Sequence, residues 1–440
     1  MEILSLIIKT ILTFCGVNIY AISLMYLHGA GKILAVIAGI VFVLVMCLIP
    51  CGSKEDGRLA RLHRGSFLMK IFLITVTAEI AACIYFAVSG KWGVTVTVNT
   101  IIAVLLLALM FIVSAVRIYT SSVQIGIKWR VLGFVFAFIP VVNVMILFRI
   151  IKLADAEYRT ECGRLALDRS RADEKVCATK YPILMVHGVF FRDVKLVNYW
   201  GRIPKALEKN GAKIYYGSQQ SADSVAGCAA ELKARIDEIV VKENCGKVNI
   251  IAHSKGGLDS RYAISMLGAD EKVASLTTIN TPHRGCQFAD YLLSKVPETV
   301  KNGIAKKYNA AMKKLGDPAP DFMAAVTDLT ASACEEMNKV CKDVQGVYYQ
   351  SVGSRSVSAS GGRFPLNFSY HLVKYFDGPN DGLVSVDSMK WGENFRLVEP
   401  KGKRGITHGD IIDLNRENIS DFDVREFYIG LVSELKAKGF

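Results

Sequence analysis

Five long apolar stretches occupy the first third of the chain. They run over roughly residues 10–27, 33–49, 71–89, 94–116 and 131–148. A helix rising about 1.5 Å per residue needs about 20 apolar residues to cross roughly 30 Å of hydrocarbon. Buried helices of a soluble protein would need amphipathic partners, which this region lacks. The pattern therefore predicts an all-α transmembrane region over residues 1–152. A cleaved signal peptide is disfavoured because no basic residue precedes Lys9.

The remainder of the chain has a different pattern. From Leu153 to Ala178, 11 of 26 residues are charged, with both signs mixed, which predicts a solvated helical linker. From residue 179 to 440, short apolar runs such as YPILMVHG and VNIIAHS alternate with amphipathic stretches. Alternating strands and helices predict an α/β domain with a mostly parallel sheet covered by helices on both faces. In such a sheet, ligands bind beyond the carboxyl ends of the strands.

Composition and charge agree with a membrane protein. The chain is 51% apolar and 21% charged, with a formal net charge of +13. Residues 1–152 hold 13 Lys and Arg against 4 Asp and Glu, so +9 of the excess lies among the apolar stretches. The basic residues therefore indicate membrane topology, and no nucleic-acid partner is expected.

The basic residues also predict an orientation. They concentrate in the second and fourth connections between the apolar stretches, at Lys54, Arg58, Arg61, Arg64, Lys70, Arg117, Lys128 and Arg130. Those connections should face the cytoplasm. Five spans would then place residues 153–440 outside the membrane, in a multi-pass protein of a bacterial plasma membrane. Four spans would turn this part inward, and Pro140 within the fifth stretch leaves that alternative open.

Two further features of the chain leave alternatives open. Glu79 lies inside the third apolar stretch, where it is either a functional site or a packing partner for Lys9 or for Asn18, Asn99 or Asn143. The 11 cysteines show no metal-ligand spacing, and free thiols would fit a reducing compartment better than the outside.

A serine follows one of the predicted strands. Ser254 lies in AHSKG (252–256), between small residues at minus two and plus two and ahead of a helix. This arrangement suits a sharp strand-to-helix turn that exposes a nucleophile. The backbone amides of Lys255 and of Val189, which follows His187-Gly188, would then form an oxyanion hole.

A serine nucleophile needs a base and an acid that orients the base. His408, in THGD after the last apolar run, is the expected base, and Asp381, in PNDGLV, is the expected acid, because the order Ser, Asp, His is that of an α/β-hydrolase. The alternatives rank lower. His283 is expected on the wall of the cleft, His371 precedes Asp381 and breaks the order, and Asp377 and Asp387 are neighbours that could substitute for Asp381.

These motifs together resemble those of the true bacterial lipases of the Pseudomonas and Burkholderia type, which are α/β-hydrolases. The similar segments are YPILMVHG, NYWGRIPKAL, GAKIYYG, VNIIAHSKGG, INTPHRG, PNDGLV and THGD. They cover about residues 180–300 and 376–415 and none of the membrane region. The resemblance implies hydrolysis of acyl esters at a lipid surface by Ser254, Asp381 and His408.

The chain departs from this family in two ways. Lys255 stands where the family usually has an uncharged or histidine side chain, which could alter the acyl or head groups accepted. The resemblance also implies a structural calcium, for which Asp410 would be one ligand. No acidic residue occurs from Val344 to Phe376, where the second ligand is expected, so we predict no metal and no cofactor.

The resemblance implies a lid within the segment over about 295–320. Val300, Ile304, Tyr308, Met312 and Leu315 recur at helical spacing among five lysines. Such a basic amphipathic helix suits a lipid interface, although it could also be a plain surface helix. The leading function is thus a membrane-anchored serine lipase or esterase acting on a lipid or ester at the bilayer. An acyltransferase or phospholipase with the same triad is the alternative, and a non-catalytic lipid-binding or sensory protein ranks last.

Overall fold

The computed structural model describes residues 2–137, 139–189, 198–363, 365–399 and 402–440. The chain forms two compact units, Met1–Leu167 and Asp168–Phe440. The boundary lies within the segment expected to be a solvated linker. That segment is helical as far as Ser170, but its first acidic side chains pair with basic residues of the first unit, as in the ion pairs Lys70–Asp155 and Arg58–Glu157.

The first unit contains only helices in the part of the chain that is described. They are α1 (Glu2–Val17), α2 (Ile19–Tyr26), α3 (Ala30–Leu48), α4 (Gly57–Val88), α5 (Val94–Ser121), α6 (Gly126–Val135) and α7 (Pro140–Ser170). Of the described helices, α3, α4 and α5 are long and apolar enough to cross a membrane. Helices α1 and α2, bent by 70° at their junction, would make a fourth span if they cross as one. Membrane-spanning length and composition are therefore present, as expected.

The fifth apolar stretch, 131–148, is not one continuous helix. Helix α6 ends at Val135, and α7 begins at Pro140. Proline has no backbone N–H with which to continue a preceding helix, so a break at this point has a local cause. Residue 138 lies outside the described residues.

Glu79 is a packing partner within the first unit. Asn18, at the junction of α1 and α2, donates to the carboxylate of Glu79 and accepts a hydrogen bond of 2.7 Å from Asn99 Nδ2. Asn99 Oδ1 in turn accepts from the amide of Ala21, 3.1 Å away, just after the bend. These contacts supply partners for polar groups at a helix break, whereas Lys9 donates to the carbonyl of Pro50 instead.

The second unit is built on a six-stranded parallel sheet, which confirms the expected α/β class with a parallel sheet covered by helices. Its strands are β1 (Ile183–Val186), β2 (Ile214–Tyr216), β3 (Val248–His253), β4 (Val273–Ile279), β5 (Tyr348–Ser354) and β6 (Phe395–Val398). Their spatial order is β2-β1-β3-β4-β5-β6, and every pairing is parallel. Every residue of β1, β3 and β4 is buried, as expected of strands covered on both faces.

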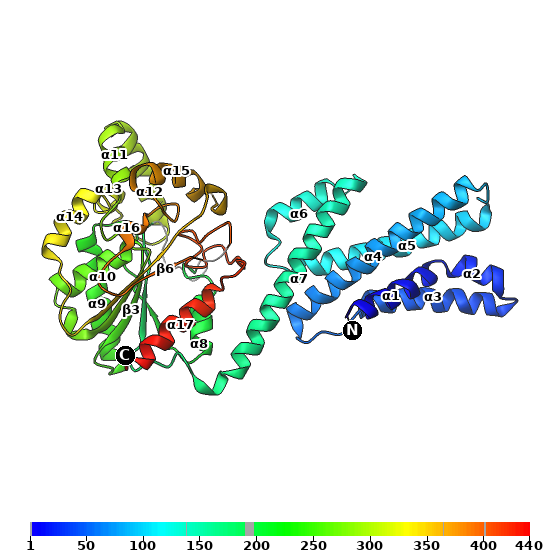
Figure 1. Ribbon diagram of the computed structural model, residues 1–440, viewed down its shortest axis with the longest axis horizontal. Coiled ribbons are helices and arrows are strands. Elements are labelled where there is room, and N and C mark those ends of the chain that lie inside the picture. The colour runs from blue at the N-terminus through cyan, green and yellow to red at the C-terminus, as the bar shows by residue number, and fades with distance from the viewer. Residues whose placement is uncertain (1, 138, 190–197, 364, 400–401) are drawn as a thin grey trace. The chain divides into compact units, whose positions relative to one another are not determined.

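Helices cover both faces of this sheet (Figure 1). Alternate residues of β1 separate into two cores, because successive side chains of a strand point to opposite faces. Ile183 and Met185 pack with α8 (Ile203–Lys209) and α17 (Val424–Ala437). Leu184 and Val186 pack with α9 (Val225–Glu243) and α10 (Lys255–Met266).

In chain order, the remaining helices of the second unit lie between β4 and β6. They are α11 (Gln287–Lys295), α12 (Glu298–Lys314), α13 (Phe322–Thr327), α14 (Ala331–Val340), α15 (Leu366–Asp377) and α16 (Val386–Met389), with short 3₁₀ turns at Ala172–Glu174, Asp270–Lys272 and Ala359–Gly361. The segment expected to be a lid is thus helical, as α12. Val300 and Ile304 are exposed there, whereas Met312 is buried.

Candidate active site

Ser254 lies at the turn between β3 and α10, as its flanking residues predicted. Its backbone has φ +54° and ψ −132°, in a region that side chains other than glycine rarely adopt. Ser254 N donates to the carbonyl of Ile279 on β4, which anchors the turn to the neighbouring strand at 3.0 Å. Strain of this kind is typical of functional positions held by their surroundings.

Two glycines allow the backbone to pack closely around this turn. A Cβ atom on Gly188 would lie 2.8 Å from Cβ of Ser254, and one on Gly256 would lie 2.4 Å from the carbonyl oxygen of His187. Both distances are shorter than a Cβ atom tolerates from another heavy atom, so any larger residue would displace the turn. These contacts bring the HG segment after β1 directly beside the serine.

Asp381 and His408 form a buried pair. Nδ1 of His408 lies 2.6 Å from Oδ2 of Asp381, and the backbone amide of His408 donates to the carbonyl of Asp381. The other carboxylate oxygen of Asp381 accepts from the amides of Leu383 and Val384, at 2.9 and 2.8 Å. A carboxylate fixed by these donors can hold the imidazole in one orientation, with Nε2 left for proton transfer.

One apolar cavity of about 750 Å³ adjoins both Ser254 and His408. Val189 is on its wall, as expected for the loop after β1. The remaining lining residues are Tyr199, His253, Tyr308, Arg363, Pro365, Leu366, Ser369, Leu383, Gly409, Ile412, Leu414 and Asn415. Tyr308 belongs to α12, so the expected lid contributes to the wall of the cavity. A space of this size and polarity suits an acyl chain.

Two contacts at the site were not predicted from the sequence. Asn280, at the end of β4 with φ +45°, donates from Nδ2 to Oδ2 of Asp381 at 2.6 Å. Tyr199 places its hydroxyl 2.6 Å from Nδ1 of His253 and accepts from the amide of Gly188 at 3.1 Å. Burial lowers the pKa of His253 well below its usual value. In the sequence, the only features that pointed to these two contacts were the strand-end position of Asn280 and the NYWGRIP segment that contains Tyr199.

The lower-ranked alternatives lie elsewhere. His283 was expected on the wall of the cleft, but it is fully buried, bonded to Thr278 and stacked on Trp391, so that expectation is wrong. His371 is exposed on α15. Asp377 accepts from two amides that begin α11, and Asp387 is an exposed partner of Lys390, so neither contacts His408.

The side chain of Lys255 points away from the cavity. It is 1% exposed, and its Nζ lies 2.8 Å from Asp259 Oδ1 and 3.3 Å from Cys228 Sγ. Residues four apart share one helix face, and this face is buried against α9. The expectation that this side chain alters the choice of acyl or head group is therefore not supported by its contacts. The backbone of Lys255 still begins the helix after Ser254.

The surroundings of Asp410 do not fit a divalent cation. Its Oδ1 lies 3.0 Å from Nη2 of Arg404, and its Oδ2 accepts from the amide of Thr407. Arg404 also binds Glu417 at 2.9 Å, and Arg363 pairs with the same carboxylate. No cluster of three or more potential metal-ligating side chains occurs among the described residues. Guanidinium groups thus take up the carboxylate oxygens that a cation would need.

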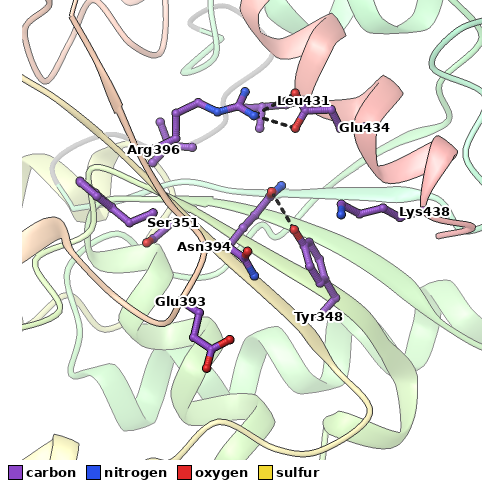
Figure 2. A pocket seen from close by; sticks show the side chains of 11 residues that line it. Tyr348, Ser351, Glu393, Asn394, Arg396, Leu431, Glu434 and Lys438 are labelled. Carbon is purple, nitrogen blue, oxygen red and sulfur yellow. Dashed lines mark hydrogen bonds and ion pairs between the residues drawn. The ribbon is translucent and has the colours of Figure 1, made fainter.

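A second cavity, of about 340 Å³, lies between β5, β6 and α17 (Figure 2). Figure 2 shows the ion pair of Arg396 with Glu434 and the hydrogen bond that the hydroxyl of Tyr348 donates to Gln350. No residue of the expected triad lines it. The residues of the expected triad lie instead at the apolar cavity, where Ser254 and His408 are on the wall and Asp381 contacts His408.

Parts of the chain are similar in sequence to known hydrolases. The model of a family described as palmitoyl protein thioesterase matches residues 182–353. A triacylglycerol lipase of Burkholderia plantarii is 34% identical over 181 residues, which are 38% of this chain and 50% of the relative. A triacylglycerol lipase of Pseudarthrobacter phenanthrenivorans is 35% identical over 175 residues, 37% of this chain and 54% of the relative. The chain thus spans about half the length of these relatives, and its resemblance to bacterial lipases is confirmed.

Solved structures also resemble the second unit. A lipase of Staphylococcus hyicus has a TM-score of 0.47 at 19% identity, and the matched region covers 59% of this chain and 97% of the lipase chain.

Proposed function

We propose that this protein is a membrane-anchored serine hydrolase that cleaves carboxylic esters of lipids through an acyl-enzyme. One observation carries the proposal: Ser254 and His408 border the same apolar cavity, while a buried Asp381 is bonded to His408. A non-catalytic lipid-binding protein would have no need of this charge-oriented histidine. The similarity to proteins named triacylglycerol lipase supports the same reaction class.

The proposed reaction follows from this geometry. Oγ of Ser254 attacks the ester carbonyl while Nε2 of His408 takes its proton, and Asp381 stabilises the imidazolium. The backbone amides of Val189 and Lys255 are the proposed donors to the oxyanion. As the intermediate collapses, His408 returns the proton to the departing alcohol. Water then attacks the acyl-enzyme with the same histidine as base, which releases the acid and restores the serine.

Substitution of the triad tests this proposal. Ser254→Ala and His408→Ala should each remove nearly all ester hydrolysis and, for Ser254→Ala, all labelling by a fluorophosphonate in a membrane fraction. Asp381→Asn should lower kcat by roughly 10³–10⁴-fold. His371→Gln, at an exposed histidine, is the matched control and should retain activity. Wild-type turnover and labelling in Ser254→Ala would refute the proposal.

A separate experiment is needed to identify the leaving group and the acceptor of the acyl chain. A phospholipase or an acyltransferase would use the same triad, and the match to a thioesterase family supports testing thioesters as well. Purified protein should be given triacylglycerol, a phospholipid and an acyl-CoA, each with a labelled acyl group. Release of free acid supports hydrolysis, whereas transfer of label to an added alcohol would assign the alternative.

Helix α12 is suited to contact with a lipid surface. Lys306, Lys307, Lys313 and Lys314 are exposed on it, together with the apolar side chains of Val300 and Ile304. Because Tyr308 of the same helix lines the cavity, movement of α12 would alter access to Ser254. Anionic head groups attract such a basic, half-apolar face.

Contacts within the first unit support a particular placement of residues 168–440 relative to the membrane. Glu157 on α7 pairs with Arg58 at the start of α4, and accepts from the amides of Val123 and Gln124 just after α5. The chain after the fifth apolar stretch therefore lies at the same end of the unit as the second and fourth connections. This supports α6 and the apolar half of α7 as a hairpin that enters and leaves on one side.

The positive-inside rule assigns the second and fourth connections to the cytoplasm, so we propose a cytoplasmic catalytic unit. This replaces the outward placement expected from five spans. The 11 free cysteines agree with a reducing compartment. Protease added to intact cells should leave the region around Ser170 uncut, and inverted membrane vesicles should expose it. Release of an active fragment from intact cells would restore the five-span arrangement.

A further inference from the structure

The catalytic cavity contains a charged group that a neutral lipid does not require. Its described walls are largely apolar, with Leu366, Leu383, Ile412 and Leu414 among them, yet Arg363 is also on the wall. Arg363 is the one described lining residue with a permanent charge. Its side chain is 58% exposed, so the guanidinium lies where the cavity meets solvent. A lipid bound in the cavity would therefore pass this group.

The ion pair of Arg363 with Glu417 leaves room for a second anion. Arg363 Nη2 contacts Oε1 of Glu417, while the other oxygen of that carboxylate accepts from Arg404. A guanidinium has five N–H donors in a planar fork, so one contact with a shared carboxylate does not use its capacity. A phosphate that approached from the cavity could take two of the remaining donors.

The cost of placing this arginine at an acyl cavity depends on the substrate. A neutral glyceride would remove water from the guanidinium and return no charge-assisted hydrogen bond. A lipid with a phosphodiester next to the scissile ester would return that interaction. Discrimination of this kind combines attraction to one ligand with a desolvation penalty against another. The geometry thus favours an anionic substrate.

We infer, on the basis of the function proposed above, that Arg363 binds the phosphate of a glycerophospholipid and makes such lipids the preferred esters. The exposed lysines of α12, whose Tyr308 lines the same cavity, have the sign that attracts an anionic membrane surface. Arg363 is a binding residue for the head group, and the chemistry at Ser254 is unaltered. Hydrolysis releases the fatty acid and leaves the phosphate on the lysophospholipid.

The test uses the full-length protein in mixed micelles of a neutral detergent. Phosphatidylglycerol, phosphatidylcholine and diacylglycerol with identical acyl chains are compared by kcat/KM. For Arg363→Gln, the ratio of kcat/KM for each phospholipid to that for diacylglycerol should fall about tenfold to a hundredfold, the loss expected for one charge-assisted contact. Arg355→Gln is the matched control. It removes an equal charge from an arginine that pairs with Glu399 and does not line the cavity, so the ratios should stay constant.

The outcomes separate the possible explanations. Equal efficiency of the wild-type protein on diacylglycerol and both phospholipids, or unaltered ratios in Arg363→Gln, would overturn the inference. Loss for phosphatidylglycerol alone would also overturn it, because that pattern reports net charge at the micelle surface. Failure of the proposed function is distinct: no ester would be cleaved by the wild-type protein, or cleavage would survive in Ser254→Ala.

Discussion

Arg404→Ala should destabilise the loop that carries His408. Arg404 makes three connections: Nη2 to Asp410 at 3.0 Å, Nη2 to Glu417 at 2.9 Å, and Nε to the carbonyl of Gly361 at 2.9 Å. Asp410 lies two residues after His408. Removal of the guanidinium would leave a carboxylate with a 2% exposed side chain beside His408, the proposed base. We expect both lower stability and lower kcat.

The magnitude follows from burial. Breaking a buried ion pair by removing one partner typically costs about 3–5 kcal/mol. The Arg404 side chain is 32% exposed, and Asp410 would keep its hydrogen bond from the amide of Thr407, so the cost here should be about 2–3 kcal/mol. Burial already raises the pKa of Asp410, which eases its protonation once the arginine is gone. For a unit of this size the melting temperature should fall by roughly 4–9 °C.

Thermal melting of the full chain in detergent, followed by circular dichroism, measures this shift. The matched control is Arg396→Ala, which removes a guanidinium bound to both oxygens of Glu434 at 2.9 Å (Figure 2). Those side chains are 51% and 43% exposed, so their pair should contribute less than about 1 kcal/mol. Adding Asp410→Asn to Arg404→Ala should recover part of the loss, because no buried charge is left unpaired. A shift no larger than that of the control, or no recovery in the double variant, would refute the reasoning.

Three further outcomes follow from the site. Treatment with a strong chelator should leave activity and melting temperature unaltered, since the oxygens of Asp410 contact Arg404 and a backbone amide. A loss of activity and a lower melting temperature, both restored by calcium and not by magnesium, would contradict this prediction. Gly256→Ala should abolish activity and lower the free energy of unfolding by about 1–3 kcal/mol, because the new Cβ would lie 2.4 Å from a carbonyl oxygen. The control is Gly430→Ala, which has no described atom within 4 Å of its Cβ and should raise the free energy of unfolding by up to about 1 kcal/mol. Burial, with a contribution from Arg261, holds the pKa of His283 well below its unfolded value, so its contribution to stability is present above about pH 6.5 and lost as pH falls. His283→Gln should reduce the slope of unfolding free energy against pH in that acid range by about 1.4 kcal/mol per unit; an unaltered slope would count against neutral burial.

The features that could be predicted from the sequence are local ones. The turn at Ser254 needs only a buried strand, small neighbours and a following helix, all of which are adjacent in the chain. The roles expected of Asp381 and His408 depended on chain order and on their positions in loops, and the structure brings the two within 2.6 Å. Strand ends of a parallel sheet converge at one edge, so loops after different strands meet without any special signal.

Side-chain directions could not be predicted in this way. Asn280 and His283 both follow β4, yet Asn280 reaches Asp381 while His283 turns into the interior against Trp391. The contact between Tyr199 and His253 joins residues 54 positions apart, which no periodicity encodes. The first unit gives a similar lesson, because apolar length alone predicted one span over 131–148, whereas α6 ends at Val135 and α7 begins at Pro140.

Lys255 shows why a position next to the proposed nucleophile need not determine specificity. As the first residue of α10 it can offer its backbone amide to the reaction, whereas its side chain follows the helix and meets Asp259 four residues later. That spacing was visible in the sequence and was the better guide to its role. A buried ion pair at this point can orient the helix but cannot touch an acyl chain or head group. If the proposed function holds, side chains on the cavity wall are the ones placed to select the substrate, and Arg363 is the charged one among those described.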